Sequence, residues 1–193
     1  MARQYTNNHL EHWVKNKFNS IQTEITKWSF MGCRPDHKLT ISFIDGSTGG
    51  YQGIGFVGSP QQIFWSDKYV PEYIRVYILE GINYAIGEAN KDHKNQNRWL
   101  DDLLRIVPPL IDNIYARMID IESRLLGDGF KTANPQNSHR YQAEVLKKYL
   151  EDAVNERKWS KIEIAYWWVK KYQLILGPLI VALIAYLFKD VFK

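Results

Sequence analysis

The chain has 193 residues, of which 45% are hydrophobic, 14% aromatic and 24% charged, and its formal net charge is +4. This composition excludes an intrinsically disordered chain, and the single cysteine, Cys33, excludes an intrachain disulfide and a zinc site made of cysteines. The length allows one compact domain with an appendage, and the mild positive charge suits anionic lipid and nucleic acid equally well.

The first predicted element is a helix from Asn8 to Trp28, in which apolar residues recur at three- and four-residue steps. His9 and His12 share one face of this helix, where two imidazoles could hold a metal ion if Asp36 or His37 supplied a further ligand. Nothing in the sequence brings those residues near. We therefore expect solvated surface histidines, with no metal and no cofactor.

The N-terminal segment also carries a short motif. Arg3 and His9 fit an Arg-x4–6-His spacing that resembles the motif of the HEPN ribonucleases. The resemblance covers these two residues alone, and it implies phosphodiester hydrolysis by a pair acting across a dimer. A membrane-bound phosphodiester hydrolase that uses His9, His12, Asp36 or His37 is therefore one alternative function.

The segment from residue 38 to about 66 is expected to form a small β-hairpin or meander. Apolar and polar residues alternate from Leu39 to Phe43, as in a half-buried strand. The Asp45–Gly46 pair predicts a tight turn, because both residues accept the backbone angles that such turns need. A second strand is expected over 51–57 and a third around 63–65.

Two helices are expected to follow. Pro71 stands at the start of a helix that runs to about residue 88, and a polar linker covers 90–97. The segment 99–126 is helical in pattern. We expect a break in it at Pro108 and Pro109, since proline removes a helical hydrogen bond and clashes with the preceding turn.

After these prolines the apolar residues repeat in heptad fashion, which has two interpretations. They can pack within the chain or form a self-association seam, because two heptads are too few to establish a coiled coil. The candidate seam residues are Ile111, Ile114, Met118, Ile121 and Leu125. A loop rich in Gly, Asn and Pro over 127–138 separates them from a last cytosolic helix around 145–154.

The C-terminal segment carries the most distinctive pattern, because no formally charged residue occurs from 172 to 188. As a helix this run is about 25 Å long, near the lower limit for crossing a bilayer, and flanking aromatic and lysine residues extend it into the headgroups. Ser160 and Glu163 form a capping box that predicts the helix start, and Pro178 predicts a kink. The expected membrane-anchor residues are Trp167, Trp168, Lys170, Lys171, Pro178 and Lys189.

These elements define one fold class and four segments. We expect an α+β, mostly helical cytosolic domain over 1–158, a juxtamembrane aromatic helix over 159–171, a transmembrane helix over 172–188 and a short distal tail over 189–193. More basic residues precede the span than follow it, which places the N-terminal bulk on the cytosolic side. We interpret the basic and aromatic residues before the span as interfacial anchors, so nucleic acid is not an expected partner.

The favoured function hypothesis is a tail-anchored, single-pass membrane protein that self-associates through its cytosolic domain. Such a protein could perturb or perforate the bilayer, as membrane-disrupting effectors of microbial antiviral defence with this layout do. The expected partners are the lipid bilayer and further copies of the chain. The second hypothesis is a membrane-tethered adaptor or ligand-sensing domain with another protein as partner. No catalytic constellation stands out, so we favour a non-enzymatic protein over the hydrolase.

Overall fold

The computed structural model describes residues 8–31, 38–52, 69–91, 95–127 and 136–187, and on the last helix it omits the side chains of 174–176, 179–180 and 182–187. The chain divides into two compact units, residues 1–157 and residues 158–193. Each unit is described by itself.

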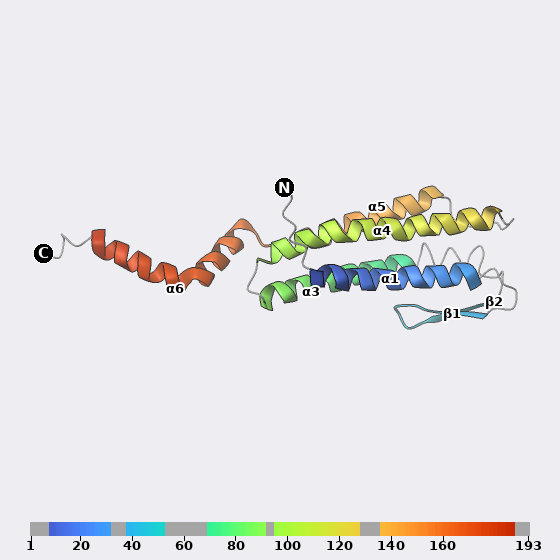
Figure 1. Cartoon of the computed structure of the whole chain (residues 1–193), viewed down its shortest axis with the longest axis horizontal. Coiled ribbons are helices and arrows are strands. Elements are labelled where there is room, and N and C mark those ends of the chain that lie inside the picture. Colours follow the sequence, from blue (N-terminus) through green and yellow to red (C-terminus); the bar gives the residue numbers. More distant parts are fainter. Residues whose placement is uncertain (1–7, 32–37, 53–68, 92–94, 128–135, 188–193) are drawn as a thin grey trace. The chain divides into compact units, whose positions relative to one another are not determined.

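The first unit is a bundle of four long helices with a β-hairpin. Contacts join α4 to α5, α3 and α1, and they join α3 to α1 and α5. In Figure 1 the colours show that successive helices run in alternate directions, which gives an up-and-down bundle. The helices are α1 (Asn8–Met31), α3 (Tyr69–Lys91), α4 (Gln96–Gly127) and α5 (Gln136–Asn155). A mostly helical fold, as expected from the sequence, is confirmed.

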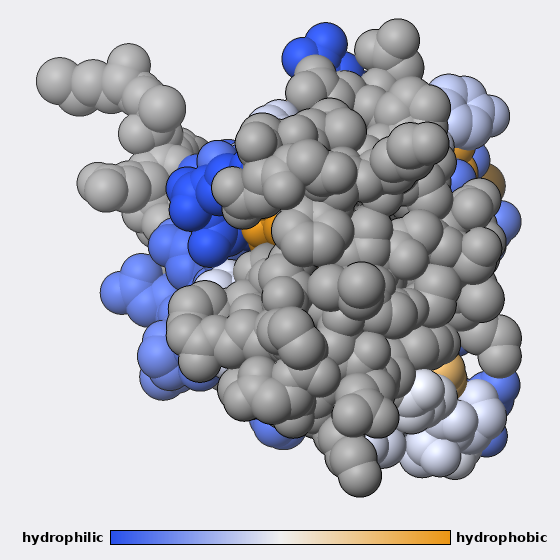
Figure 2. Space-filling model, turned by 90° about the vertical axis from the view of Figure 1, so that its right-hand side faces the viewer, coloured by the Kyte–Doolittle hydropathy of each residue, from blue (hydrophilic) through white to orange (hydrophobic). Residues whose placement is uncertain are grey.

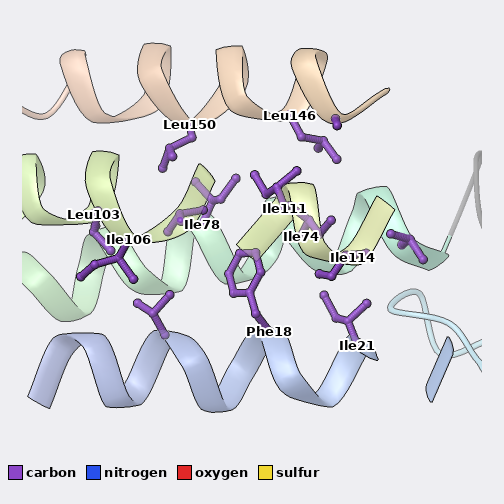
Figure 3. Close-up of a cluster of buried hydrophobic side chains, with 14 of the residues drawn as sticks. Phe18, Ile21, Ile74, Ile78, Leu103, Ile106, Ile111, Ile114, Leu146 and Leu150 are labelled. Carbon is purple, nitrogen blue, oxygen red and sulfur yellow. The ribbon is translucent and has the colours of Figure 1, made fainter. Parts of the chain in front are cut away.

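The core lies along the axis of this bundle, where each helix contributes a stripe of aliphatic and aromatic side chains. In Figure 3 these side chains point between the helices. Each fully buried Ile, Leu or Phe contributes roughly 1.5–3 kcal/mol through removal of apolar surface from water. The labelled residues are Phe18 and Ile21 of α1, Ile74 and Ile78 of α3, Leu103, Ile106, Ile111 and Ile114 of α4, and Leu146 and Leu150 of α5. In the view of Figure 2, along the long axis, the described surface residues are mostly hydrophilic.

The β-hairpin consists of β1 (Lys38–Ser42) and β2 (Thr48–Gln52), paired antiparallel. Its turn is stabilised by a hydrogen bond from the Gly46 N–H to the Phe43 carbonyl, 3.0 Å, and Gly46 has a φ of 80°. The Asp45 carboxylate accepts a hydrogen bond from the Ser47 N–H at 2.9 Å. The predicted turn at Asp45 and Gly46 is thus confirmed, whereas the expected third strand around 63–65 lies outside the described residues.

The helix α4 corrects one prediction, because it continues through Pro108 and Pro109 without a break. Neither proline has an N–H for the carbonyl four residues earlier, so two helical hydrogen bonds are lost. Buried side chains on both sides of the pair, including Val107 and Ile111, hold the backbone in place through their packing. Pro109 itself is exposed and Pro108 half-buried, so the rings are kept away from the densest part of the core.

The heptad residues of α4 favour packing within the chain, one of the two interpretations that their spacing left open. Ile111, Ile114, Met118 and Ile121 are buried within the single chain, at 0–4% exposure. They pack against the other helices of the bundle and form part of its core, so they do not form an exposed self-association seam. The side chain of Leu125, the fifth candidate, lies outside the described residues.

The described part of the second unit, residues 158–187, contains the helix α6, which spans Lys161–Leu187 and includes Pro178. The predicted capping box is present: the Ser160 N–H donates to a Glu163 carboxylate oxygen at 2.8 Å, and the Glu163 N–H donates to the Ser160 hydroxyl at 3.3 Å. These hydrogen bonds lower the pKa of the Glu163 carboxyl, the backbone bond being the larger cause. Within the part of the chain whose side chains are described, no helix is long and apolar enough to span a membrane.

Candidate functional site

The first candidate surface is a row of aromatic rings along the beginning of α6, which we call the aromatic ladder: Trp159, Trp167, Trp168 and Tyr172. Ring centroids lie 6.1 Å apart between Trp159 and Trp167, and 5.5 Å apart between Trp167 and Trp168. The ring of Tyr172 stacks on Trp168 at 5.0 Å with an interplanar angle of 18°. Trp168 and Tyr172 are one helical turn apart, Trp167 and Trp168 are neighbours in the sequence, and Trp159 lies just before α6, so one short stretch of chain supplies all four rings.

The ladder carries a cation. The Lys171 ammonium lies 4.7 Å from the centre of the Trp167 ring and 5.8 Å from that of Tyr172. An ammonium over an aromatic face is attracted by the ring quadrupole, and Trp is the strongest of such partners. Rings with polar edges beside lysines are the chemistry found where a protein meets the headgroup region of a bilayer.

The surroundings of the ladder are apolar and exposed. Ile162 is 81% exposed, Tyr166 68% and Val169 59%, and their spacing of four and three residues places these apolar side chains on one face of the helix. An exposed apolar face of this kind is a candidate contact surface for a membrane or a partner.

The second candidate surface is a groove between α1 and α3, which we call the aromatic groove. Its volume is about 470 Å³, and its walls are built by one face of each helix. The rings of Trp13 and Tyr84 stack at 5.1 Å with an interplanar angle of 10°. The lining residues are His9, His12, Trp13, Asn16, Lys17, Ser20, Tyr77 and Tyr84.

The charge of the aromatic groove is balanced by an ion pair. The Lys17 ammonium lies 2.8 Å from a Glu80 carboxylate oxygen, and it also lies 5.3 Å from the Trp13 ring centre and 5.1 Å from that of Tyr77. Further polar atoms line the same space: the Ser20 hydroxyl is 3.3 Å from the Tyr77 hydroxyl. The groove thus combines flat apolar rings with hydrogen-bonding groups and little net charge.

The histidine candidates have distinct outcomes. His9 and His12 do share one face of α1, since both line the aromatic groove, and His12 Nε2 lies 3.0 Å from the Asn16 amide nitrogen. Asp36 and His37 lie outside the described residues. Among the residues that are described, no three His, Cys, Asp or Glu side chains come together in a way that could hold a metal ion.

A buried polar pair, which the sequence patterns did not predict, joins α4 to α5. Glu122 is 1% exposed and His139 0%, and Glu122 Oε2 lies 3.0 Å from His139 Nε2. The Tyr115 ring centre is 6.1 Å from that of His139. Burial raises the pKa of the Tyr115 hydroxyl, an effect that the charge of Arg75 partly offsets.

The spacing of Glu122 and His139 from buried apolar residues indicates that each lies on the apolar stripe of its helix. His139 stands four residues before the buried Ala143 and seven before Leu146, so it lies on the apolar stripe of α5. Glu122 likewise follows the buried Met118 by four residues on α4. A polar residue on an apolar stripe predicts a buried partner, but it does not identify which one.

Membrane contact and small-molecule binding are thus the two chemistries that these surfaces suggest. The aromatic ladder belongs to the second unit, whereas the aromatic groove belongs to the first. The buried pair is closed to ligands and contributes to packing. No protein-family model, curated protein or solved structure matches this chain.

Proposed function

We propose that the chain is a membrane-tethered protein, in which α6 attaches the helical bundle to a lipid bilayer. The observation that carries this proposal is the exposure of apolar and aromatic side chains around α6, including Ile162, Tyr166 and Val181 at 66–81%. Leaving such side chains in water forgoes roughly 1.5–3 kcal/mol for each residue that a bilayer could bury. A lipid phase removes this cost without requiring a partner protein.

The length of α6 agrees with this role. Its 27 residues correspond to about 40 Å of helix, close to the thickness of a bilayer with its headgroups. The part from 172 to 187 contains no formally charged residue and matches the hydrocarbon core. The preceding part carries the aromatic ladder with Lys161, Lys170 and Lys171, which suits the interfacial layer.

Pro178 is compatible with this placement. Membrane helices tolerate proline because the freed carbonyl can be satisfied by neighbouring helices or by local adjustment of the backbone. In α6 the helix continues on both sides of Pro178. The orientation with the bundle in the cytosol rests on the excess of basic residues before residue 172, with only Lys189 and Lys193 after it.

For the bundle itself we favour a tethered binding module over a self-associating pore. The heptad residues that motivated self-association are buried inside the chain, so they give no support to a ring of bundles. The aromatic groove, in contrast, supports an adaptor or ligand-sensing role, because it presents rings and polar groups on one open face. Tethering confines such a module to a surface and raises its effective concentration there.

The attachment can be tested by expressing the full chain in cells and extracting the membranes with alkaline carbonate, which removes peripheral proteins. We expect the chain to stay in the membrane pellet. Val181→Arg places a charge near the middle of the proposed span, at a cost of roughly 2.5–3.5 kcal/mol, and should shift the chain toward the soluble fraction.

The matched control is Thr23→Arg, which adds the same side chain at an exposed position of α1. It should leave the distribution unchanged. Quantitative release of the unmodified chain by carbonate, or equal distributions for Val181→Arg and the unmodified chain, would contradict the proposal.

A further inference from the structure

The positive charge of the chain is concentrated just before the uncharged run of α6. Residues 158–171 contain four lysines and one acidic residue, Glu163, so they carry a net charge of +3, compared with +4 for the whole chain. The rest of the chain is therefore almost neutral in sum. The basic character of this protein belongs to the segment that carries the aromatic ladder.

Lys170 and Lys171 are the two lysines nearest to the uncharged run. Both residues are exposed, and the Lys171 ammonium lies 4.7 Å from the centre of the Trp167 ring. No acidic residue occurs in the sequence from 164 to 187, so this part of α6 supplies no carboxylate that offsets their charge. Lysines of the bundle differ in this respect, since Lys15 and Lys148 each form an ion pair with a carboxylate of their own helix.

The spacing along the helix corresponds to the layers of a bilayer. The uncharged run begins at Tyr172, so with this run in the hydrocarbon both Lys170 and Lys171 reach the headgroup layer. Lys161 stands nine residues before Lys170, which is roughly 14 Å farther along the helix. That distance exceeds the Debye length of about 10 Å at 0.1 M salt, so the charge of the bilayer surface acts on Lys161 more weakly.

A layer of negative headgroups is complementary to this arrangement. Anionic phospholipids attract lysines that lie within a Debye length of the surface, whereas zwitterionic phospholipids offer them no net charge. Nucleic acid is also an anion, but its binding would leave the exposed apolar face of α6 in water. We propose, and this rests on the proposed attachment of α6, that residues 158–171 select anionic over zwitterionic phospholipids, chiefly through Lys170 and Lys171.

The test measures which lipid the inserted chain contacts. The full chain is reconstituted into phosphatidylcholine bilayers with a trace of spin-labelled phosphatidylglycerol or spin-labelled phosphatidylcholine. Electron paramagnetic resonance then gives the fraction of each label that the protein immobilises. We expect phosphatidylglycerol to be favoured about fivefold, the factor that one lysine contributes at an anionic surface. In 1 M salt, where the Debye length is about 3 Å, the preference should become weaker.

Substitutions locate the contact. The double variant Lys170→Gln/Lys171→Gln should bring the preference close to one, whereas Lys161→Gln should reduce it only slightly. The matched control Lys15→Gln/Lys148→Gln removes the same net charge from side chains of the bundle that are 52% and 65% exposed. This control should keep the preference of the unmodified chain.

The outcomes separate lipid selection from attachment. Equal immobilisation of both labels would mean that α6 enters the bilayer without selecting anionic lipid, which overturns the selectivity alone. Immobilisation of neither label would mean that α6 does not enter the bilayer, which contradicts the proposed function as well. A loss of preference in the bundle control as large as that in Lys170→Gln/Lys171→Gln would assign the effect to the net charge of the chain and overturn the role of these two lysines.

Discussion

The buried pair of Glu122 and His139 should couple α4 to α5 strongly. Both side chains are removed from water, and their facing atoms are 3.0 Å apart. Removing one member leaves the other buried without its partner, which costs roughly 1–3 kcal/mol for a polar group and more for a charged one. We therefore expect His139→Leu to destabilise the bundle by about 3 kcal/mol, a large part of the stability of an ordinary domain.

Replacing both members should be far less harmful than the single changes imply. Two leucines of similar volume need no hydrogen-bond partners, and such replacements of buried pairs are often neutral or stabilising. The double variant Glu122→Leu/His139→Leu should thus be at least as stable as His139→Leu alone. The coupling energy from the complete cycle should reach about 2 kcal/mol, where independent sites would give less than roughly 0.5 kcal/mol.

The assay is urea unfolding of the full chain and its three variants in detergent micelles, followed by circular dichroism. A solvent-exposed pair on the same helix serves as the control: Lys148 and Asp152 of α5 lie 2.9 Å apart, with side chains 65% and 56% exposed. Removing that pair should change stability by only about 0.3–0.5 kcal/mol. Additive effects of Glu122→Leu and His139→Leu, or a cost for His139→Leu as small as that of the control, would refute the reasoning.

Two further predictions concern local structure. Gly87 lies inside α3 with open space where the methyl group of an alanine would lie, so Gly87→Ala should stabilise the protein by about 0.5–1 kcal/mol. Gly46→Ala should destabilise the protein by about 1 kcal/mol, because the φ of Gly46 is 80°, an angle that alanine rarely adopts. The urea concentration at the unfolding midpoint should rise for Gly87→Ala and fall for Gly46→Ala. Because the folded-state pKa of Glu163 is lowered, its contribution to the first turn of α6 is present at neutral pH and is lost as pH falls through that lowered value. The protection of amides near Ser160, measured relative to the intrinsic exchange rate at each pH, should therefore fall in acid, and Glu163→Gln should remove this pH dependence.

Much of the local structure could be predicted from the sequence because it depends on short-range patterns. The apolar period of α1, the turn at Asp45 and Gly46, and the capping box of Ser160 and Glu163 each involve residues a few positions apart. In such cases the backbone geometry and the neighbouring side chain are sufficient to determine the outcome.

Sequence patterns were insufficient where the local structure depends on packing between residues that are far apart in the chain. Pro108 and Pro109 have low helix propensity, but packing of α4 against three other helices outweighs the two lost hydrogen bonds. The heptad pattern around Ile114 correctly indicated an apolar stripe but left open whether the same chain or a second copy covers it, and in the structure the stripe is buried within the chain. A stripe of this kind does not specify which surface covers it.

The same limit applies to the candidate sites. Sequence spacing placed His9 and His12 on one helix face, but the rings of Tyr77 and Tyr84 that complete the aromatic groove come from α3. The pair of Glu122 and His139 is separated by the segment 128–135, so no local motif connects its members. Both features depend on how helices meet, which periodicity alone does not determine.

The central claim is that α6 crosses a bilayer from about residue 172, and one measurement tests it directly. The full chain is added to preformed sealed vesicles, trypsin is added outside, and the membrane-protected peptides are identified by mass spectrometry. A spanning helix places Lys189 inside the vesicle, so we predict a protected fragment that begins after Lys170 or Lys171 and contains an uncleaved Lys189. Cleavage at Lys189 in intact vesicles, or complete digestion of α6, would contradict the claim.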